Sequence, residues 1–200
     1  MNEKVTTRDR ILDSALTLFS EKGYDGVGVD LIAERAGLKG PSIYKHFKSK
    51  EEILDVLIEN VEDYYTQNFG SQMNPGRIPT TAEELIAGAL GRIQFTLYDD
   101  TIVKTRKILT MEQFRNARIA KLATRHNLDA ISAMYQKIFA CMMEEGTIRH
   151  SDAGMLSIAF VSPITLLIQV CDREPWRMQE MVEQMKDYMT YFAQNFLLFS

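Results

Sequence analysis

Apolar residues recur at helical spacing along almost the whole chain, and this periodicity constrains the fold more than any other feature. Residues 11–19 carry apolar side chains at steps of three and four, and the same spacing returns in residues 85–97 and 128–142. No stretch alternates apolar and polar residues for long enough to predict a strand. The sequence therefore predicts an all-α protein. A chain of 200 residues can bury roughly 70% of the surface that its unfolded form exposes, which is enough for a stable core.

Helix ends are marked by residues that satisfy free backbone groups. Three hydroxyl-to-acid pairs at capping-box spacing predict helix starts: Thr6 with Asp9, Ser49 with Glu52, and Thr81 with Glu84. Gly23 and Gly146 are expected to end helices, since glycine adopts the left-handed conformation without steric cost. A further helix is expected to begin near Asn127, and residues 70–79, GSQMNPGRIP, form the clearest loop.

The remaining composition excludes several classes of protein. Cys141 and Cys171 lie far apart in apolar helical patterns, so we expect free, buried thiols. Residues 153–171 lack charge but contain Ser, Thr, Pro and Gln, which favours a buried helix over a membrane span. The polar start of the chain lacks the apolar segment of a secretory signal, so we expect a cytoplasmic protein without membrane association.

Three small or apolar residues in the first quarter of the chain predict a helix-turn-helix. Two short helices that cross at a steep angle need a small residue at the crossing, a turn residue tolerant of positive φ, and an apolar plug on the second helix. Ala33, Gly37 and Ile43 provide these in order. Another kind of helical hairpin could carry the same three residues.

The surroundings of this motif are cationic, although the chain has a net charge of −4. From Arg35 to Lys50 every charged residue is basic, and hydroxyl groups of Ser42 and Tyr44 are interleaved with the lysines. Such a run is often a solvated helix face, but it also suits phosphate oxygens of a nucleic acid. Screening acts over about 8 Å at physiological salt, so distant acidic residues barely weaken the local field. The sequence thus predicts a phosphate-facing surface.

Residues 23–54, GYDGVGVDLIAERAGLKGPSIYKHFKSKEEIL, resemble the N-terminal DNA-binding region of TetR-type transcriptional regulators. The resemblance rests on short groups of residues that fall where the family pattern expects them: Gly23-Tyr24, Ile32-Ala33, Ala36-Gly37, Ser42-Ile43-Tyr44, His46-Phe47 and Ser49-Lys50-Glu51. It implies an all-α fold with an N-terminal three-helix helix-turn-helix domain and a larger helical domain for effector binding and dimerisation. Capping at Ser49 places the boundary between residues 1–48 and 49–200.

The resemblance implies that residues 31–36 form a supporting helix and residues 40–47 a recognition helix. It assigns contacts with double-stranded DNA to nine residues: Gly28, Lys39, Gly40, Pro41, Ser42, Tyr44, Lys45, His46 and Lys50. In this family the residues at Pro41 and Ser42 lie at the floor of the groove. A proline ring can rest on a thymine methyl group, and a lysine at a base edge favours guanine.

The other contacts are expected at phosphates. The resemblance places Tyr44 and His46 near the DNA backbone, and Lys45 at a base or a phosphate. Lys50, together with the amides that begin the fourth helix, is expected to bind a phosphate.

Two positions depart from the family pattern. Gly28 stands at the start of the supporting helix, where the family usually has a threonine or serine, so the hydroxyl that would touch a phosphate is missing. Glycine still serves as an N-cap at a cost of a few tenths of a kcal/mol. Asp30 would repel DNA if it faced outward, and we expect it to cap the helix instead.

A helix this short offers few base contacts, so a homodimer on a palindromic operator is expected. The apolar segments near the C-terminus predict the dimer interface, which we assign to Phe160, Ile164, Met181, Met185, Tyr188 and Phe192. Internal core is the alternative interpretation of the same stripes. Methionine and aromatic side chains that can repack around a ligand predict an effector site, which we assign to Phe95, Met111, Phe114, Tyr135, Phe139, Met143, Phe160 and Trp176.

These features predict a ligand-responsive homodimeric transcriptional regulator, a repressor released from its operator by a small molecule. A helical adaptor that binds protein without DNA is the main alternative. An enzyme is disfavoured, since the three histidines lack metal-ligand spacing and no catalytic motif or cofactor loop is present. A second basic cluster within residues 104–125 fits a solvated face, a contact beside the DNA-binding domain, added phosphate attraction or an anionic effector. The effector, the operator and the sign of regulation do not follow from the sequence.

Overall fold

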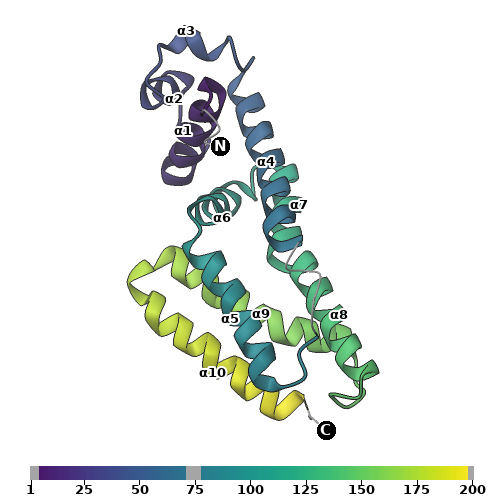
Figure 1. The fold of residues 1–200 in the computed structure, drawn as a ribbon. Helices are drawn as coiled ribbons and strands as arrows, with labels where there is room; N and C mark the ends of the chain where they lie inside the picture. Colours follow the sequence, from purple (N-terminus) through teal and green to yellow (C-terminus); the bar gives the residue numbers. More distant parts are fainter. Residues whose placement is uncertain (1–4, 71–77, 198–200) are drawn as a thin grey trace. The chain divides into compact units, whose positions relative to one another are not determined.

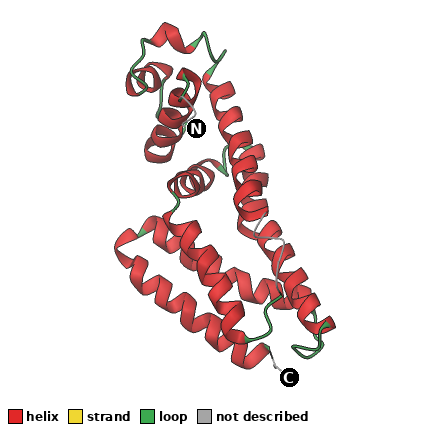
Figure 2. Cartoon of the chain, viewed as in Figure 1, coloured by secondary structure: helices red, strands yellow, loops and turns green. Residues whose placement is uncertain are grey.

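The computed structural model describes residues 5–70 and 78–197, which form helices joined by loops and turns, without a strand in these ranges (Figure 2). Figure 1 labels the α-helices along the chain. Their bounds are α1 Thr7–Lys22, α2 Val29–Arg35, α3 Gly40–Ile43, α4 Lys50–Gly70, α5 Ala82–Tyr98, α6 Asp100–Glu112, α7 Ala117–Thr124, α8 Ala130–Glu144, α9 Ala153–Arg173 and α10 Met178–Phe196. A π-helical turn, η1 Arg125–Asp129, joins α7 to α8, and a 3-10 turn, η2 Pro175–Arg177, precedes α10. The all-α prediction is confirmed.

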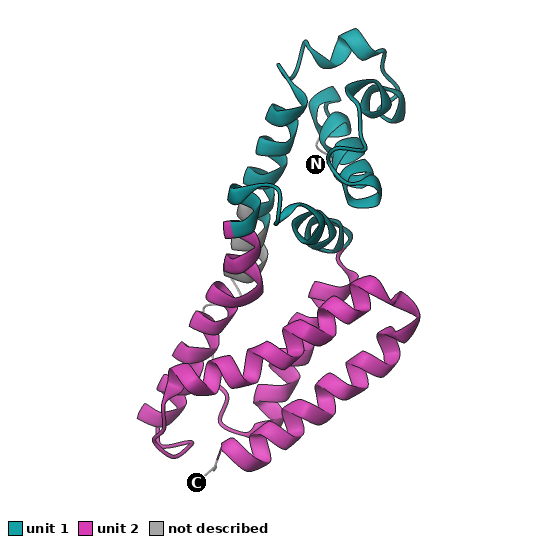
Figure 3. Cartoon of the chain, turned by 180° about the vertical axis from the view of Figure 1, so that it is seen from behind, with its two compact units in different colours: residues 1–71, 100–120 teal, residues 72–99, 121–200 magenta. Residues whose placement is uncertain are grey.

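The chain divides into two compact units (Figure 3). Unit 1 comprises Met1–Ser71 and Asp100–Ala120, so α6 belongs to the same unit as α1 to α4. Unit 2 comprises Gln72–Asp99 and Lys121–Ser200. The expected boundary after residue 48 divides the chain by function, which the compact units do not test, and it stays a prediction.

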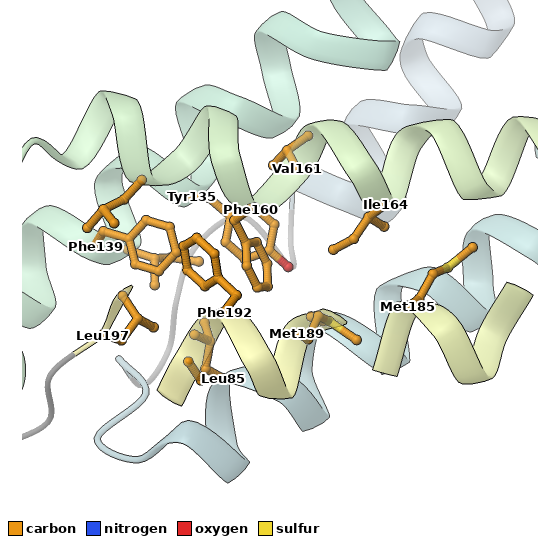
Figure 4. Close-up of a cluster of buried hydrophobic side chains, with 14 of the residues drawn as sticks. Leu85, Tyr135, Phe139, Phe160, Val161, Ile164, Met185, Met189, Phe192 and Leu197 are labelled. Carbon is orange, nitrogen blue, oxygen red and sulfur yellow. The ribbon is translucent and has the colours of Figure 1, made fainter. Parts of the chain in front are cut away.

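Unit 2 is built around one apolar core in which α8, α9 and α10 meet α5 (Figure 4). Phe160 of α9 lies at its centre, with ring centroids 4.7 Å from Tyr135, 5.8 Å from Phe139 and 5.0 Å from Phe192. All four rings are buried. Tilted and edge-to-face aromatic pairs add about 0.5–1.5 kcal/mol each beyond their buried area, so this cluster contributes to the stability of the unit.

The predicted caps form, with one shift. At α1 the box is reciprocal: the Asp9 amide donates to Thr6 Oγ1 at 3.1 Å, and the Thr6 amide donates to the Asp9 carboxylate at 2.9 Å. The Thr6 hydroxyl and amide therefore hold the pKa of Asp9 below its usual range. At α4 the Glu52 amide donates to Ser49 Oγ at 3.2 Å, as predicted.

The shift concerns the returning carboxylate. Glu52 accepts from the amide of Lys48 instead of Ser49, and Glu84 accepts from the amide of Thr80 at 2.8 Å instead of Thr81. In both helices the carboxylate therefore reaches one residue further back than the expected box, and still satisfies a free backbone donor.

Pro163 lies inside α9, where its ring removes the amide that would donate to the carbonyl of Ala159. The hydroxyl of Tyr188, on α10, donates to this carbonyl. A proline inside a helix leaves such a carbonyl without its helical donor, and here a neighbouring helix supplies one. Burial of the Tyr188 hydroxyl raises its pKa, so it remains protonated and able to donate.

The cysteines are free thiols, as predicted; Cys171 is buried and Cys141 is half-buried. The helix expected from Asn127 is continuous with the preceding one, because η1 carries α7 directly into α8. It ends at Gly146, with φ +71°, as predicted.

Candidate nucleic-acid interface

The first three helices of unit 1 pack as the sequence predicts. The apolar side chains of α1 face the core, with Ile11, Ala15 and Phe19 fully buried. Ala33 on α2 and Ile43 on α3 are also fully buried, and Gly37 between them has φ +69°. The small crossing residue, the turn and the plug therefore occupy the positions that a helix-turn-helix requires.

The recognition segment is shorter as a helix than the predicted range 40–47. The α-helical part, α3, covers only Gly40–Ile43. Beyond it the His46 amide donates to the Ile43 carbonyl at 2.8 Å, a tighter step of three residues, and the chain then turns to bury Phe47. The prediction extended the helix too far because a buried apolar residue four positions after Ile43 is equally compatible with continued helix.

A close approach fixes α2 against α3. A Cβ on Gly40 would lie 2.2 Å from Oδ1 of Asp30, so only glycine admits the carboxylate there. Asp30 was expected to favour the start of its own helix, and the structure also directs it at the start of α3. A larger residue at position 40 would require the Asp30 side chain to rotate away.

Most of the nine predicted DNA contacts lie on the surface of unit 1. Six are exposed: Gly28, Lys39, Pro41, Tyr44, Lys45 and His46. Gly40, Ser42 and Lys50 are half-buried. Within the described residues no ion pair neutralises Lys39, Lys45 or Lys48, so the surface keeps its positive charge. This arrangement suits a polyanion.

Lys50 has hydrogen-bond acceptors within the protein. Its Nζ donates to the carbonyls of Tyr24 and Val27, each at 3.0 Å, and lies 4.0 Å from the centroid of the Tyr24 ring. The ammonium thus joins the start of α4 to the loop between α1 and α2. The prediction assigned this charge to a phosphate, which is not tested; in this structure the protein itself provides its acceptors.

Tyr24, which Lys50 covers, is a neutral phenol. Burial, followed by the nearby Glu51 carboxylate, raises the pKa of Tyr24 well above its usual range near 10. Its ring also packs on Phe19 with centroids 5.3 Å apart, which anchors the loop to α1.

Residues 100–120 contact the loop between α1 and α2, and also α4, within unit 1. The Tyr24 amide donates to Glu112 Oε1 at 2.9 Å across 88 positions of sequence. Arg115 pairs with Asp25 at 3.2 Å, and Arg118 pairs with Asp55 at 2.6 Å. No local pattern announces such contacts, because each partner lies more than 60 positions away.

The second basic cluster is therefore explained in part. Arg115 contacts the loop between α1 and α2, beside the predicted DNA-binding domain, which was one of the four interpretations, and Arg118 contacts α4. Both pairs are well exposed and contribute less than about 1 kcal/mol each. Lys104 pairs with Asp100 of its own helix. The interpretations as added phosphate attraction and as an effector site are not tested.

The predicted effector residues do not gather at one place. Tyr135, Phe139, Met143 and Phe160 lie together in the core of unit 2. Burial raises the pKa of Tyr135 to about 12. Phe95 is half-buried on α5, whereas Trp176, in η2, is 78% exposed.

Two further predicted effector residues lie in unit 1. Met111 is exposed at the end of α6, and Phe114, in the following turn, is 90% exposed. The prediction grouped residues by type, and the fold distributes them over both units.

The predicted dimer residues lie inside the single chain. Five of them are buried in its core: Phe160, Ile164, Met181, Met185 and Phe192. Tyr188 is half-buried and donates to α9. The interpretation therefore selected the wrong side of the helix in α9, and internal core, its stated alternative, describes these six residues. The exposed side of α9 carries Met155, Ile158 and Leu166.

Comparison with known proteins agrees with the geometry of unit 1. Residues 11–57 match the model of the family described as bacterial regulatory proteins, tetR family. Over these residues the chain is similar to tetR-family regulators. The biofilm operon icaADBC HTH-type negative transcriptional regulator IcaR of Staphylococcus epidermidis is 47% identical over 58 residues. That match covers 29% of this chain and 31% of the relative, so it spans less than a third of either protein.

Solved structures share the fold over nearly the whole chain. SmeT, described as the repressor of the Stenotrophomonas maltophilia multidrug efflux pump SmeDEF, has a TM-score of 0.68 at 20% identity, covering 96% of this chain and 91% of SmeT. Its complex with triclosan has a TM-score of 0.71. The fatty acid degradation regulator FadR from Bacillus halodurans has a TM-score of 0.65 at 19% identity, covering 98% of both chains. At these identities the likeness shows the all-helical architecture.

Proposed function

We propose that this chain is a homodimeric, DNA-binding transcriptional regulator that acts in the cytoplasm as a repressor. The observation that carries the proposal is the exposed, unneutralised cationic surface on a helix-turn-helix whose residues 11–57 match the tetR family. IcaR, the relative at 47% identity, is a negative regulator, which supports repression. Arg, Lys and hydroxyl groups at phosphates supply affinity, and the short α3 in the major groove supplies sequence selectivity.

Selection of bound duplexes from a random pool tests this function. We expect a palindrome whose half-sites lie about 34–36 Å apart. If each protomer neutralises about three to five phosphates, the logarithm of the binding constant falls with the logarithm of salt concentration at a slope of about −5 to −9. Purified protein that binds no duplex at low ionic strength contradicts the proposal.

A second copy of this chain is proposed to cover α9. This helix is long and apolar enough to cross a membrane by length and composition, and 33% of its most apolar window is buried within the chain. Its exposed side carries Met155, Ile158 and Leu166, at 63%, 47% and 58% exposure. The spacing of these residues forms a stripe that an isologous partner helix would bury.

Sedimentation of charged variants tests the dimer. Ile158→Glu and Leu166→Glu are expected to give monomers, because each places a carboxylate in the proposed interface. Tyr98→Glu is the matched control, since Tyr98 is 66% exposed on α5, outside this stripe. A monomeric unmodified protein, or dimers that survive both α9 changes, would refute this interface.

Release by a small molecule is proposed to act through unit 2. The structural relative SmeT has been solved with triclosan, which supports an effector for this fold. The buried aromatic and methionine side chains around Phe160 are those most able to repack around a ligand. Screening for compounds that raise the thermal midpoint of the protein and lower its affinity for the selected duplex tests this part.

Changes to exposed residues of the cationic surface distinguish a DNA-binding regulator from an adaptor that binds protein. Tyr44→Ala and Lys45→Ala are expected to reduce duplex binding at least tenfold without changing the fold. An adaptor that uses its apolar faces would keep its partner in both variants.

A further inference from the structure

Three glycines have positive φ and end helices in the described residues, and one of them behaves differently. After Gly37 the Leu38 amide donates to Ala33 at 2.8 Å, and after Gly146 the Thr147 amide donates to Met142 at 2.9 Å. These are Schellman bonds, in which the helix satisfies its own last carbonyls. At both ends the amide after the glycine therefore finds its acceptor in the preceding helix.

At the end of α1, the amide that follows Gly23 finds its acceptor on another helix. The backbone of Gly23 has φ 72° and ψ 164°, a region that is essentially restricted to glycine, and this turns the next amide away from α1. That amide, on Tyr24, donates to Glu112 Oε1 at 2.9 Å. Glu112 is 4% exposed, and a Cβ on Gly23 would lie 3.3 Å from the same carboxylate oxygen. The carboxylate thus takes the place of a missing Schellman acceptor.

The loop that Glu112 reaches is held by contacts from several helices, and Tyr24 receives most of them. The Tyr24 carbonyl accepts from Lys50, and the Tyr24 ring packs on Phe19. One residue is therefore held at its amide by α6, at its carbonyl by α4, and at its ring by α1. The loop leads directly into α2, which packs on α3, so its backbone direction sets where the cationic surface lies on unit 1.

We propose that Glu112 is a positioning residue for DNA binding, which fixes the loop between α1 and α2 without touching DNA. This inference rests on the proposed function, because it assigns a part of operator affinity to a residue outside the family-matched region. A buried amide without an acceptor is unfavourable, so loss of the carboxylate allows the loop to leave its conformation. The helices then present the same side chains in a less defined orientation.

Amide hydrogen exchange at Tyr24, measured on the DNA-free protein, tests the contact. Glu112→Leu removes the acceptor and is expected to speed exchange at least tenfold. Glu112→Gln keeps an oxygen in the same place and is expected to stay within threefold of the unmodified protein. Glu84→Leu is the matched control in unit 2, since the Glu84 carboxylate also accepts from a backbone amide, that of Thr80. It is expected to leave Tyr24 exchange unchanged, and unchanged exchange in Glu112→Leu overturns the proposal.

Affinity for the selected duplex tests the consequence, at a temperature where every variant is fully folded. We expect Glu112→Leu to bind the duplex about tenfold more weakly than the unmodified protein. The affinity of Glu112→Gln should stay within about twofold of the unmodified protein, and that of Glu84→Leu should not change. A merely structural role would lower the thermal midpoint without separating Gln from Leu in affinity, and that result overturns the proposal. If the unmodified protein binds no duplex, the proposed function fails and the positioning role fails with it, whereas the exchange measurement still decides the Glu112 contact.

Discussion

Each unit has an apolar core, and the two units differ in the long-range contacts that are added to it. In unit 1, charged side chains bridge distant parts of the chain: Glu112 reaches Tyr24, Lys50 reaches Tyr24 and Val27, and Arg118 reaches Asp55. In unit 2 the helices meet through aromatic rings and methionines around Phe160. Hydrogen bonds require defined distances and angles, whereas apolar contacts tolerate repacking. The difference teaches that unit 1 is built to hold a surface in place, and unit 2 to bury volume that can rearrange.

The largest expected effect contrasts two phenylalanines. Phe160→Ala removes a fully buried ring from unit 2 and is expected to cost about 3–5 kcal/mol of unfolding free energy. Phe114→Ala, at a position that is 90% exposed in unit 1, is expected to stay within about 0.5 kcal/mol. Urea denaturation measures both. Similar costs at the two sites would mean that Phe114 is covered in solution.

Lys50→Met removes a cation from unit 1 and keeps its aliphatic stem. Two hydrogen bonds from a charged group to carbonyls are lost, so we expect a cost of about 2 kcal/mol in urea denaturation. The salt slope of duplex binding should stay unchanged. Lys45→Met, at an exposed position, should instead leave stability unchanged and reduce the magnitude of the slope by about 1.8, because each of the two protomers loses one phosphate contact. A reduced slope with unchanged stability for Lys50→Met would instead support the predicted contact between Lys50 and a DNA phosphate.

Tyr188→Phe tests one of the few polar contacts in the core of unit 2. Loss of the hydroxyl leaves the Ala159 carbonyl without its donor and is expected to cost about 1–2 kcal/mol. In a Pro163→Ala background the restored amide can donate to that carbonyl, so the cost should fall below about 0.5 kcal/mol. A double-mutant cycle by thermal denaturation measures this coupling. Equal costs in both backgrounds would show that the effect of Tyr188 on stability is independent of Pro163.

The smallest expected effect concerns His126 of η1. Burial, with a contribution from the neighbouring Arg125, lowers the pKa of His126 from 6.5 to about 4. The unfolded chain therefore binds the proton more readily than the folded one between pH 6.5 and 4. The contribution of the neutral His126 to the free energy of unfolding is fully present above pH 6.5. It falls as the pH drops through this window, by about 1 kcal/mol between pH 7 and 5 for a partly exposed ring. In His126→Gln this loss should disappear from the pH profile of urea denaturation.

Local features of the fold could be predicted from the sequence. The Thr6 capping box and the end at Gly146 depend on residues within a few positions, and both formed. The packing of Ala33 and Ile43 follows from the same short range. Family resemblance gave the architecture, and the family match at residues 11–57 agrees with it.

The remainder depends on which helix covers which face. In α9 both sides are apolar, so periodicity alone could not separate buried Ile164 from exposed Ile158. For Lys50, a cation near a predicted DNA surface has the same sequence pattern whether it binds a phosphate or a carbonyl. Glu112 carries no signal at all, because its acceptor role arises only when α6 packs on α1.

The position of Glu112 has a practical consequence for chimeric regulators. A graft that joins residues 1–57 to a foreign C-terminal portion would transfer every proposed DNA contact and leave the Tyr24 amide with no acceptor. Transplantation would require Asp100–Ala120 as well, so the segments that a graft must carry are discontinuous in the gene.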